Sequence, residues 1–583
     1  MKSLVVVLLI IKCVAGSAVS REGPLVSTPK GQIRGVRAED GDYDSYLGIP
    51  YALVDEEDPF GPSTPHPDFE GTFDAVIGGV ECIQASNSPA TGIIQCLQLD
   101  VFVPNNPQST ALLPVMVYIH GGAFVVGSKA EATPQFLVKH DVILVSINYR
   151  LGLYGFLCTS EPEYKNVGLK DQVLALKWIK ENIESFGGDP DKITAFGMSA
   201  GGTSVDLHLL TSEGLINRAI LMSGTALMSW LNFEVNDEMP ISLAKHFDYT
   251  GNDVKGAIEF LSTVNADEAV TAADRLDYVS DGRGYPKTLP CVETESENAF
   301  LTNYPVNMQP KVKGMDIMIG YASKEMMFMY PNADDVQFYR DYSFDFELLF
   351  EFDEPHGVNT VRQFYIGDEA PNENLQDEII DYGSDRAFVH PAERSVTKYL
   401  DSEANNVYKY LFSYVGDRNI LKIMLGLTAE GACHADDLGY LFDVPLIANV
   451  PRTEADQRII DAMTKMWTDF AKYGNPTPES TELIPEWKPV DKKQRPYLNI
   501  DNSISLESRA FNKRIAFWDL YYKLHGDKVR GYEAIEDNEE GGNEEGGNEE
   551  DGNEENDDGN NGSTSVIPVA FLSIITLCVT LLM

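Results

Sequence analysis

Basic residues are scarce in this sequence of 583 residues. It has 45 lysines and arginines against 90 aspartates and glutamates, and its formal net charge is −45. Such an acidic surface repels phosphates, so the composition argues against nucleic acid as a partner. Part of the excess is local, because residues 533–558 carry 14 acidic side chains and no basic one. A solvated acidic surface accounts for the rest without any partner.

Cysteine is also scarce, with seven in the chain and no Cys-x-x-Cys pair or His/Cys cluster. This pattern argues against a zinc site, and we expect no metal. Cys13 and Cys578 lie in terminal segments that we expect to be removed. Five cysteines then remain: Cys82, Cys96, Cys158, Cys291 and Cys433. An odd number in an oxidising compartment predicts at least one free thiol.

Both ends of the chain have the composition of targeting segments. Residues 1–18 combine Lys2, an apolar run and small residues, which predicts a cleaved secretory signal peptide. Residues 566–583 carry no charge and follow a polar spacer of small residues. This pattern indicates that residues 562–583 are a C-terminal signal for a GPI anchor, which would hold the protein on the outer face of the plasma membrane. A single membrane-spanning anchor is the alternative, and release as a secreted protein is the other possible location.

An acidic segment precedes this C-terminal signal. We assign it to residues 529–561, in which an imperfect repeat of Glu, Asn and Gly from residue 536 onward has no apolar side chain to bury. Such a segment cannot offset the entropy cost of ordering, so we expect a disordered stalk. Asn561 begins the one Asn-x-Ser/Thr site without an intervening proline, so we expect little N-glycosylation of the globular part.

Residues 19–528 contain no low-complexity break, which predicts one large domain. Short branched apolar runs alternate with segments of helical periodicity. Predicted strands cover residues 112–120, 141–149 and 191–198, and predicted helices cover residues 169–186 and 200–210. This alternation predicts an α/β fold with a central, mostly parallel sheet flanked by helices.

The stretch Gly197-Met198-Ser199-Ala200-Gly201 fits the Gly-x-Ser-x-Gly pattern. Alone the pattern is weak evidence, but here it joins a predicted strand to a predicted helix. In that setting Ser199 would lie on a sharp turn, with the hydroxyl exposed as a nucleophile. The turn crowds the residues two before and two after the serine, which explains a glycine at both places.

A second glycine-rich loop follows the first predicted strand. Residues 118–124 (Tyr-Ile-His-Gly-Gly-Ala-Phe) place adjacent backbone amides in a loop with small side chains. We expect these amides, with that of Ala200, to form an oxyanion hole. We interpret His120 as a structural residue of this loop rather than as a general base.

A serine nucleophile needs a base and an acid that orients the base. Beyond the predicted helix at residues 200–210, five histidines follow: His246, His356, His390, His434 and His525. Of these, His434 lies in a small-residue loop before a helical apolar pattern, and Glu325 follows an apolar strand. Groups at the carboxyl ends of such strands are well placed for a site, yet composition alone does not select among the candidates.

These stretches resemble the type-B carboxylesterase/cholinesterase family of α/β hydrolases, over about residues 24–520. The resemblance is carried by residues 46–52, 117–128, 147–157, 166–202, 218–224, 431–442 and 470–478. Together these segments are highly specific, and the wording around His434 looks most like insect carboxylesterases. The resemblance implies an α/β-hydrolase fold and hydrolysis of carboxylic esters without a cofactor.

The resemblance also implies a role for individual residues. Ser199 becomes the nucleophile, Glu325 the triad acid and His434 the base. The oxyanion donors become the amides of Gly122, Ala123 and Ala200, and Gly121 and Met198 lie beside them in the sequence. Ser223 matches a serine near the histidine.

Further matches concern structural contacts. Cys82 and Cys96 match the family's first disulfide, and Arg150 with Asp171 matches an ion pair. The family's later disulfides have no counterparts in this sequence, so we expect Cys158, Cys291 and Cys433 to be unpaired.

Several positions depart from the family pattern. Met198 stands where relatives usually have a polar residue, and Lys324-Glu325-Met326 replaces the usual Asp-Glu-Gly. Ala123 replaces a common glycine. No tryptophan lies between Cys82 and Cys96, so choline esters are poor candidates and neutral apolar esters are favoured. A non-catalytic surface adhesion protein is the alternative function.

Overall fold

The computed structural model describes residues 23–533, except 86–88, 106, 109, 213, 277–286, 331, 333, 345–347, 349–350 and 353–356. The predicted signal peptide, most of the predicted stalk, the anchor signal and His356 lie outside the described residues. Within the described part, no helix is long and apolar enough to cross a membrane.

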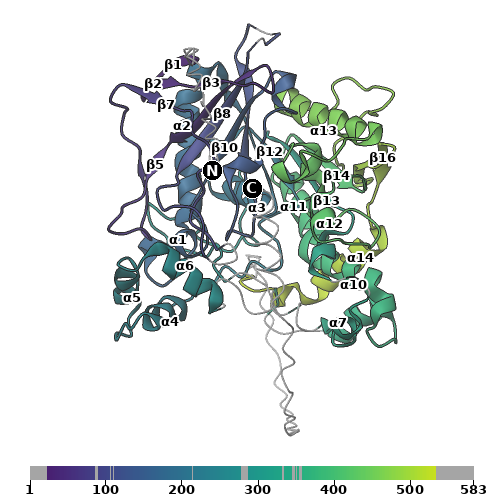
Figure 1. Ribbon diagram of the computed structural model, residues 1–583. Coiled ribbons are helices and arrows are strands. Elements are labelled where there is room, and N and C mark those ends of the chain that lie inside the picture. The colour runs from purple at the N-terminus through teal and green to yellow at the C-terminus, as the bar shows by residue number, and fades with distance from the viewer. Residues whose placement is uncertain are drawn as a thin grey trace, which may run out of the picture.

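A large mixed sheet runs through the molecule (Figure 1). Its strands follow the order β16 (Ser505–Ser508), β15 (Pro496–Ile500), β14 (Asn406–Phe412), β13 (Asp316–Ala322), β12 (Arg218–Met222), β11 (Gly188–Met198), β9 (Leu113–Ile119), β10 (Ile143–Ile147), β8 (Gln98–Pro104), β4 (Tyr43–Pro50) and β3 (Val36–Arg37). Every neighbouring pair from β15 to β10 is parallel, and the strands at both edges are antiparallel. The prediction of a mostly parallel central sheet is confirmed.

Two small sheets lie beside the large one. One contains β1 (Leu25–Thr28), β2 (Gly31–Arg34) and β7 (Thr72–Asp74), and the other contains β5 (Ala52–Leu53) and β6 (Thr64–Pro65).

Helices cover the sheet and surround one end of it. The α-helices are α1 (Gly152–Gly155), α2 (Val167–Asn182), α3 (Ala200–Thr211), α4 (Glu238–His246), α5 (Val254–Leu261), α6 (Ala266–Arg275), α7 (Val336–Arg340), α9 (Val358–Ile366), α10 (Gln376–Ser384), α11 (His390–Asp401), α12 (Ile420–Met424), α13 (Glu454–Tyr473) and α14 (Asn512–His525). Helices α2, α3, α11 and α13 contact the central strands. Figure 1 shows α4, α5 and α6 grouped on one side of the lower end, and α7, α10 and α14 on the other.

The predicted elements lie close to the observed ones. The predicted strand at residues 112–120 corresponds to β9, and the predicted strand at residues 191–198 corresponds to the end of β11. The predicted strand at residues 141–149 contains β10. The predicted helix at 169–186 begins at Val167, and its last residues form a 3₁₀ turn, Ile183–Phe186. Gly187 ends this turn because it adopts the left-handed conformation at φ 83°.

The packed chain continues beyond residue 528, where the sequence predicts the domain to end. Val529 is buried and pairs with Phe352 in an isolated β-bridge, and the Arg530 amide donates to the Glu351 carbonyl at 2.8 Å. The apolar Val529 explains the difference, since it joins the core even though acidic residues follow it closely in the chain.

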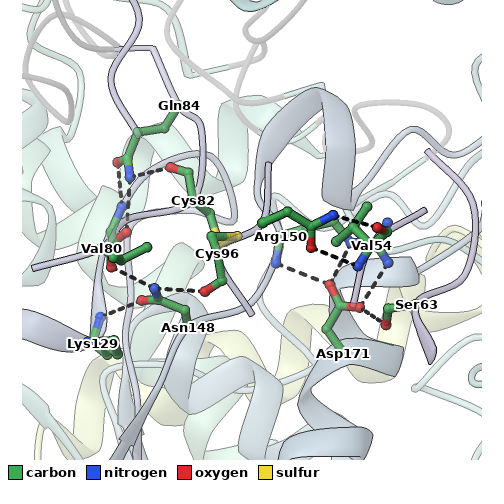
Figure 2. The surroundings of a disulfide bond; sticks show 12 residues. Val54, Ser63, Val80, Cys82, Gln84, Cys96, Lys129, Asn148, Arg150 and Asp171 are labelled. Carbon is green, nitrogen blue, oxygen red and sulfur yellow. Dashed lines mark hydrogen bonds and ion pairs between the residues drawn. A yellow bond between two sulfur atoms is a disulfide. The ribbon is translucent and has the colours of Figure 1, made fainter. Parts of the chain in front are cut away.

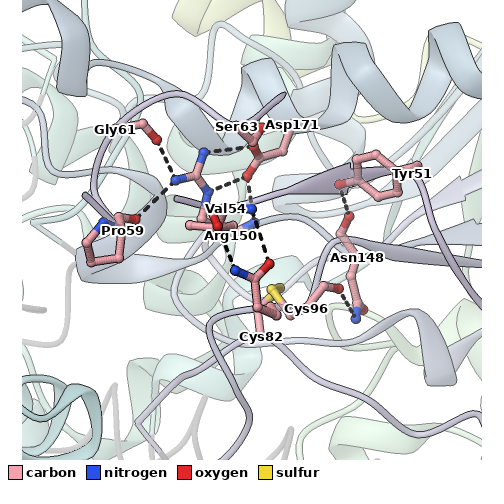
Figure 3. Close-up of polar contacts among 11 residues, drawn as sticks. Tyr51, Val54, Pro59, Gly61, Ser63, Cys82, Cys96, Asn148, Arg150 and Asp171 are labelled. Atoms are coloured by element: carbon pink, nitrogen blue, oxygen red, sulfur yellow. Dashed lines mark hydrogen bonds and ion pairs between the residues drawn. A yellow bond between two sulfur atoms is a disulfide. The ribbon is translucent and has the colours of Figure 1, made fainter. Parts of the chain in front are cut away.

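Two predicted contacts near the start of the domain are confirmed. Cys82 and Cys96 form a disulfide, and the Cys96 carbonyl accepts a bond from Asn148 (Figure 2). Arg150 and Asp171 form a buried bidentate pair with two N–O distances of 2.8 Å. The same guanidinium donates to two carbonyls, those of Pro59 and Gly61 (Figure 3).

The expectation that Cys158 and Cys291 are unpaired is wrong, because they form a second disulfide. They are separated by 133 residues in the sequence, so a comparison of spacing does not reveal the pair. The fold brings them together through Asn166, whose side chain bonds both the N–H and the C=O of Cys291, at 2.9 and 2.7 Å. Cys433 is free and buried, as the odd number of cysteines predicts.

Candidate active site

Ser199 lies in the sharp turn between β11 and α3. Its backbone has φ 58° and ψ −125°, a conformation that residues other than glycine rarely adopt. A Cβ atom added at Gly197 would lie 2.5 Å from the Gly201 carbonyl carbon, and one at Gly201 would lie 2.0 Å from the Ile119 oxygen. The predicted crowding around the serine is therefore present. A glycine is also required at position 224, which sequence reasoning missed, because a Cβ there would lie 2.0 Å from the backbone carbonyl oxygen of Ser199.

The glycine loop after β9 passes directly beside this turn. Gly122, Ala123 and Phe124 all have positive φ, at 97°, 54° and 64°. A Cβ added at Gly121 would lie 2.7 Å from the Met198 oxygen and 3.2 Å from the Ser199 Cβ. Among the described residues, the amide N–H groups of Gly122, Ala123 and Ala200 have no hydrogen-bond acceptor. The loop and the start of α3 thus offer unused donors beside Ser199.

The glycine loop is fastened by a residue of the first disulfide loop. The buried Gln84 side chain accepts from the Gly127 amide at 2.8 Å and donates to the Gly127 carbonyl at 3.1 Å. It also donates to the Cys82 carbonyl at 3.0 Å (Figure 2). Gly127 itself needs to be glycine, since its φ is 127° and an added Cβ would lie 2.3 Å from His120 Nδ1. Nothing in the sequence distinguishes Gln84 as this clamp.

His120 is built into the structure of the loop. Its ring stacks on Tyr149 at 4.4 Å between centroids, and its Nδ1 lies 2.9 Å from the Gly121 carbonyl oxygen. Complete burial lowers the pKa of His120 to about 4, so the ring is neutral at pH 7 and Nδ1–H donates to that oxygen. These contacts agree with the structural interpretation of His120.

Glu325 and His434 meet in a buried pair. The Glu325 Oε2 atom lies 2.6 Å from His434 Nδ1, and Oε1 accepts the Ala322 amide at 2.6 Å. The Glu325 side chain is fully buried, which strengthens its interaction with the imidazole.

The two loops that carry this pair are joined by backbone contacts. The Lys324 amide donates to the Ala432 carbonyl at 2.9 Å, and the Ala432 amide donates to Ser323 Oγ at 2.9 Å. The His434 amide donates to the Glu325 carbonyl at 3.3 Å. Glutamate and histidine are therefore positioned by one connected backbone unit.

Two aromatic rings contact the imidazole of His434. Phe328 stacks on it with a centroid distance of 5.3 Å, and Phe388 lies against it at 4.7 Å. Phe388 belongs to a π-helical turn, Asp385–Val389, between α10 and α11. π-helical turns are rare in proteins, and those that occur often lie at functional sites. The sequence carries no recognisable signal for Phe388.

Buried carboxyl groups lie directly beyond His434 in the chain. The Tyr410 hydroxyl donates to Asp437 at 3.0 Å, and burial raises the pKa of Asp437 to about 7, with the nearby charge of Glu325 adding to the effect. Burial likewise raises the pKa of Asp436 to about 6, although it accepts from Asn419 and the Cys433 amide. The raised pKa leaves part of the Asp437 population neutral near pH 7, which reduces the repulsion between Asp437 and Glu325.

Ser199 lies at the same end of the sheet as Glu325, beyond the carboxyl ends of the central parallel strands. Strands β11, β12 and β13 are parallel neighbours, and residues 199, 223 and 325 all follow their carboxyl ends. The Ser199 amide donates to the Met222 carbonyl, and the Ser223 amide donates to the Gly320 carbonyl. No hydrogen bond among the described residues joins the Ser199 hydroxyl to His434, and the buried Ser223 hydroxyl has no partner there either. Catalytic hydrogen bonds often tighten only when substrate binds.

Candidate metal ligands are not clustered in the ranges that the structure describes. No group of three or more His, Cys, Asp or Glu side chains there could hold a metal ion.

Comparison with known proteins identifies the family of this chain. The model of the family described as "Carboxylesterase family" matches residues 22–518. The chain belongs to the carboxylesterase family. This confirms the predicted family, the α/β-hydrolase fold and, at the level of the family, the prediction of a carboxylic ester hydrolase.

Individual carboxylesterases match over most of their length. Venom carboxylesterase-6 of Apis mellifera is 31% identical, with 88% of this chain and 97% of that protein covered. Juvenile hormone esterase of Tribolium castaneum is 33% identical, with 78% and 84% covered. The crystal structure of juvenile hormone esterase from Manduca sexta, with OTFP covalently attached, superposes with a TM-score of 0.73 at 27% identity. That match covers 86% of this chain and 100% of the other.

Gln84 offers a test of how this carboxylesterase holds its glycine loop. Replacing Gln84 by Ala removes both bonds to Gly127, so we expect faster hydrogen exchange at residues 121–127 and a loss of about 1–3 kcal/mol in stability. Gln95 is a matched control, because its side chain bonds the N–H and C=O of Val54 in the same way, at 3.2 and 2.6 Å. Gln95→Ala should leave exchange at residues 121–127 unchanged. Equal exchange in both variants would show that Gln84 is not the clamp.

Proposed function

We propose that this protein is a serine carboxylesterase that uses Ser199, His434 and Glu325 as a catalytic triad. The observation that carries the proposal is the buried bond from Glu325 to His434 Nδ1, at the same sheet edge as Ser199. The carboxylate would fix the tautomer in which Nε2 is free to accept the serine proton. The family and the strained turn of Ser199 support the same roles.

The reaction would proceed through an acyl-enzyme. His434 takes the Ser199 proton as the serine oxygen attacks the ester carbonyl, and the imidazolium then protonates the leaving alcohol. Water attacks the acyl-enzyme with the same histidine as base, which releases the acid and restores Ser199.

The charge that develops on the carbonyl oxygen also needs stabilisation. The amides of Gly122, Ala123 and Ala200 are suited to this task, because they have no other acceptor among the described residues. The N-terminus of α3 adds a favourable dipole at the same place. Donors held in advance by the loop require no reorganisation during the reaction.

Replacement of the nucleophile tests the proposal. We expect Ser199→Ala to lower kcat for p-nitrophenyl and naphthyl esters by at least about 10³-fold while the fold and the melting temperature are retained. Ser262→Ala, at the end of α5, is the control and should keep full activity. Hydrolysis that survives in Ser199→Ala would refute the triad. A wild-type protein that hydrolyses no ester would instead favour the alternative of a surface adhesion protein.

We further propose that Met198 favours neutral apolar esters. Its side chain is almost buried, and its Cε atom would lie 3.3 Å from a Cβ at Gly121, beside the loop that carries the free amides. A thioether at this place gives an apolar and adaptable surface, with no charge to attract a cationic alcohol group or to stabilise the imidazolium.

Charge at position 198 is the variable to change. Met198→Glu should raise kcat/KM for butyrylcholine relative to its neutral isostere 3,3-dimethylbutyl butyrate by about 5-fold, because an added carboxylate attracts the cation by about 1 kcal/mol. Met198→Gln has a similar shape without the charge and should leave this ratio unchanged. If Met198→Glu also leaves the ratio unchanged, Met198 does not set this preference.

The location of the protein is a separate proposal. Residues 1–18 would direct it to the secretory pathway, and residues 562–583 would be exchanged for a GPI anchor, with the acidic segment as a stalk. The two disulfides of the domain are consistent with an oxidising compartment.

Enzymatic release distinguishes this anchor from the alternatives. Treatment of expressing cells with a phosphatidylinositol-specific phospholipase should move the protein into the medium, since the enzyme cuts the lipid from the anchor. Retention on the membrane would favour a spanning anchor, and recovery in the medium before treatment would favour plain secretion. A variant that ends at residue 561 is the control for release without an anchor.

A further inference from the structure

Lys324 immediately precedes Glu325 and extends away from the catalytic pair toward α10. Its Nζ atom lies 2.7 Å from Asp377 and 2.9 Å from Asp381, both on that helix. The side chain is only 14% exposed, so these ion pairs are less screened by solvent than ordinary surface pairs. The stem of the lysine also packs on the histidine loop, residues 431–434, where a Cβ at Gly431 would lie 2.7 Å from Lys324 Cγ.

The helix that Lys324 contacts reaches the catalytic pair at two further points. Ser384, the last residue of α10, accepts the Met326 amide at 3.0 Å, directly after Glu325. The π-helical turn that follows carries Phe388, whose ring lies 4.7 Å from that of His434. A displacement of α10 would therefore move a contact to the residue after Glu325 and, through the π-helical turn, a contact to His434.

Arg514 of α14 completes the ionic contacts of this helix. It contacts Asp381 and lies 2.8 Å from Asp385, the first residue of the π-helical turn. Asp385 also accepts from the Tyr365 hydroxyl at 2.6 Å. Lys324 and Arg514 thus hold the three carboxylates at positions 377, 381 and 385. Of the two cations, Lys324 is the one that connects these carboxylates to the loop that carries Glu325.

We propose that Lys324 is a positioning residue, which fixes α10 and its π-helical turn relative to Glu325 and His434 through its ion pairs with Asp377 and Asp381. The inference rests on the proposed triad. Lys324 touches no reacting atom, and its effect is to keep the imidazole and the carboxylate in a productive arrangement. Small displacements of catalytic groups cost large factors in rate, so the effect belongs in kcat rather than in substrate binding.

The test replaces the charge while keeping the length of the side chain. We expect Lys324→Met to lower kcat for a p-nitrophenyl ester about 10-fold with KM changed less than about 2-fold, and Lys324→Arg to restore kcat to within about 3-fold. Adding Lys324→Met to the variant Asp377→Asn with Asp381→Asn should cost little more, because that variant already leaves Lys324 without either carboxylate.

A matched ion pair elsewhere controls for a general loss of stability. Lys170 lies 2.8 Å from Glu293 and is 21% exposed. The other hydrogen bonds of Glu293 among the described residues go to Asn166 and the Phe300 amide, away from the loops that carry Glu325 and His434. Lys170→Met should lower the melting temperature as Lys324→Met does, yet leave kcat unchanged. A wild-type kcat in Lys324→Met, an equal loss in Lys170→Met, or no recovery in Lys324→Arg would each overturn the proposal.

The same assay separates this inference from the proposed function. Ser199→Ala and Glu325→Gln are measured alongside. If both keep their activity, the triad is wrong and the inference fails with it. If both are inactive while Lys324→Met turns over normally, the triad stands and only the role of Lys324 is refuted.

Discussion

The buried hydrogen bond between Glu325 and His434 is the interaction on which the rest of the site depends. A carboxylate without solvent is costly unless its oxygens are satisfied, and here one accepts the Ala322 amide and the other accepts from the imidazole. The arrangement requires two loops, far apart in the sequence, to keep a fixed distance. The backbone bonds between residues 323–325 and 432–434 meet that requirement. The rings of Phe328 and Phe388 then confine the imidazole.

The other half of the site depends on close approach of backbones. The turn at Ser199 passes so near to the end of β9 and to Gly224 that side chains have no room at three neighbouring positions. The strain of the serine is stabilised by the sheet on one side and by α3 on the other. Because β11, β12 and β13 are parallel neighbours, this turn and the buried pair emerge at one edge.

Sequence patterns predicted the fold and the crowded turn at Ser199 well, for local reasons. Branched apolar runs identify buried strands, and the glycines around Ser199 are required by geometry that involves only a few residues. Long-range pairing was less predictable. The Cys158–Cys291 bond was missed, because Asn166 and the segment around residue 291 meet only in the folded chain. Gln84, Ser384 and Phe388 were missed for the same reason, since a single amide, hydroxyl or ring in the sequence does not specify its partner.

By itself, the sequence determined the α/β architecture, the family and the sharp turn at Ser199, since each depends on periodicity or on a short motif whose residues are neighbours in the chain. Only the tertiary structure decided that Glu325 meets His434 and that Gln84 binds the glycine loop at Gly127. It also decided that Lys324 pairs with α10. These contacts join residues tens to more than a hundred positions apart. Such pairings are selected by the packing of the whole sheet and its helices rather than by any local preference.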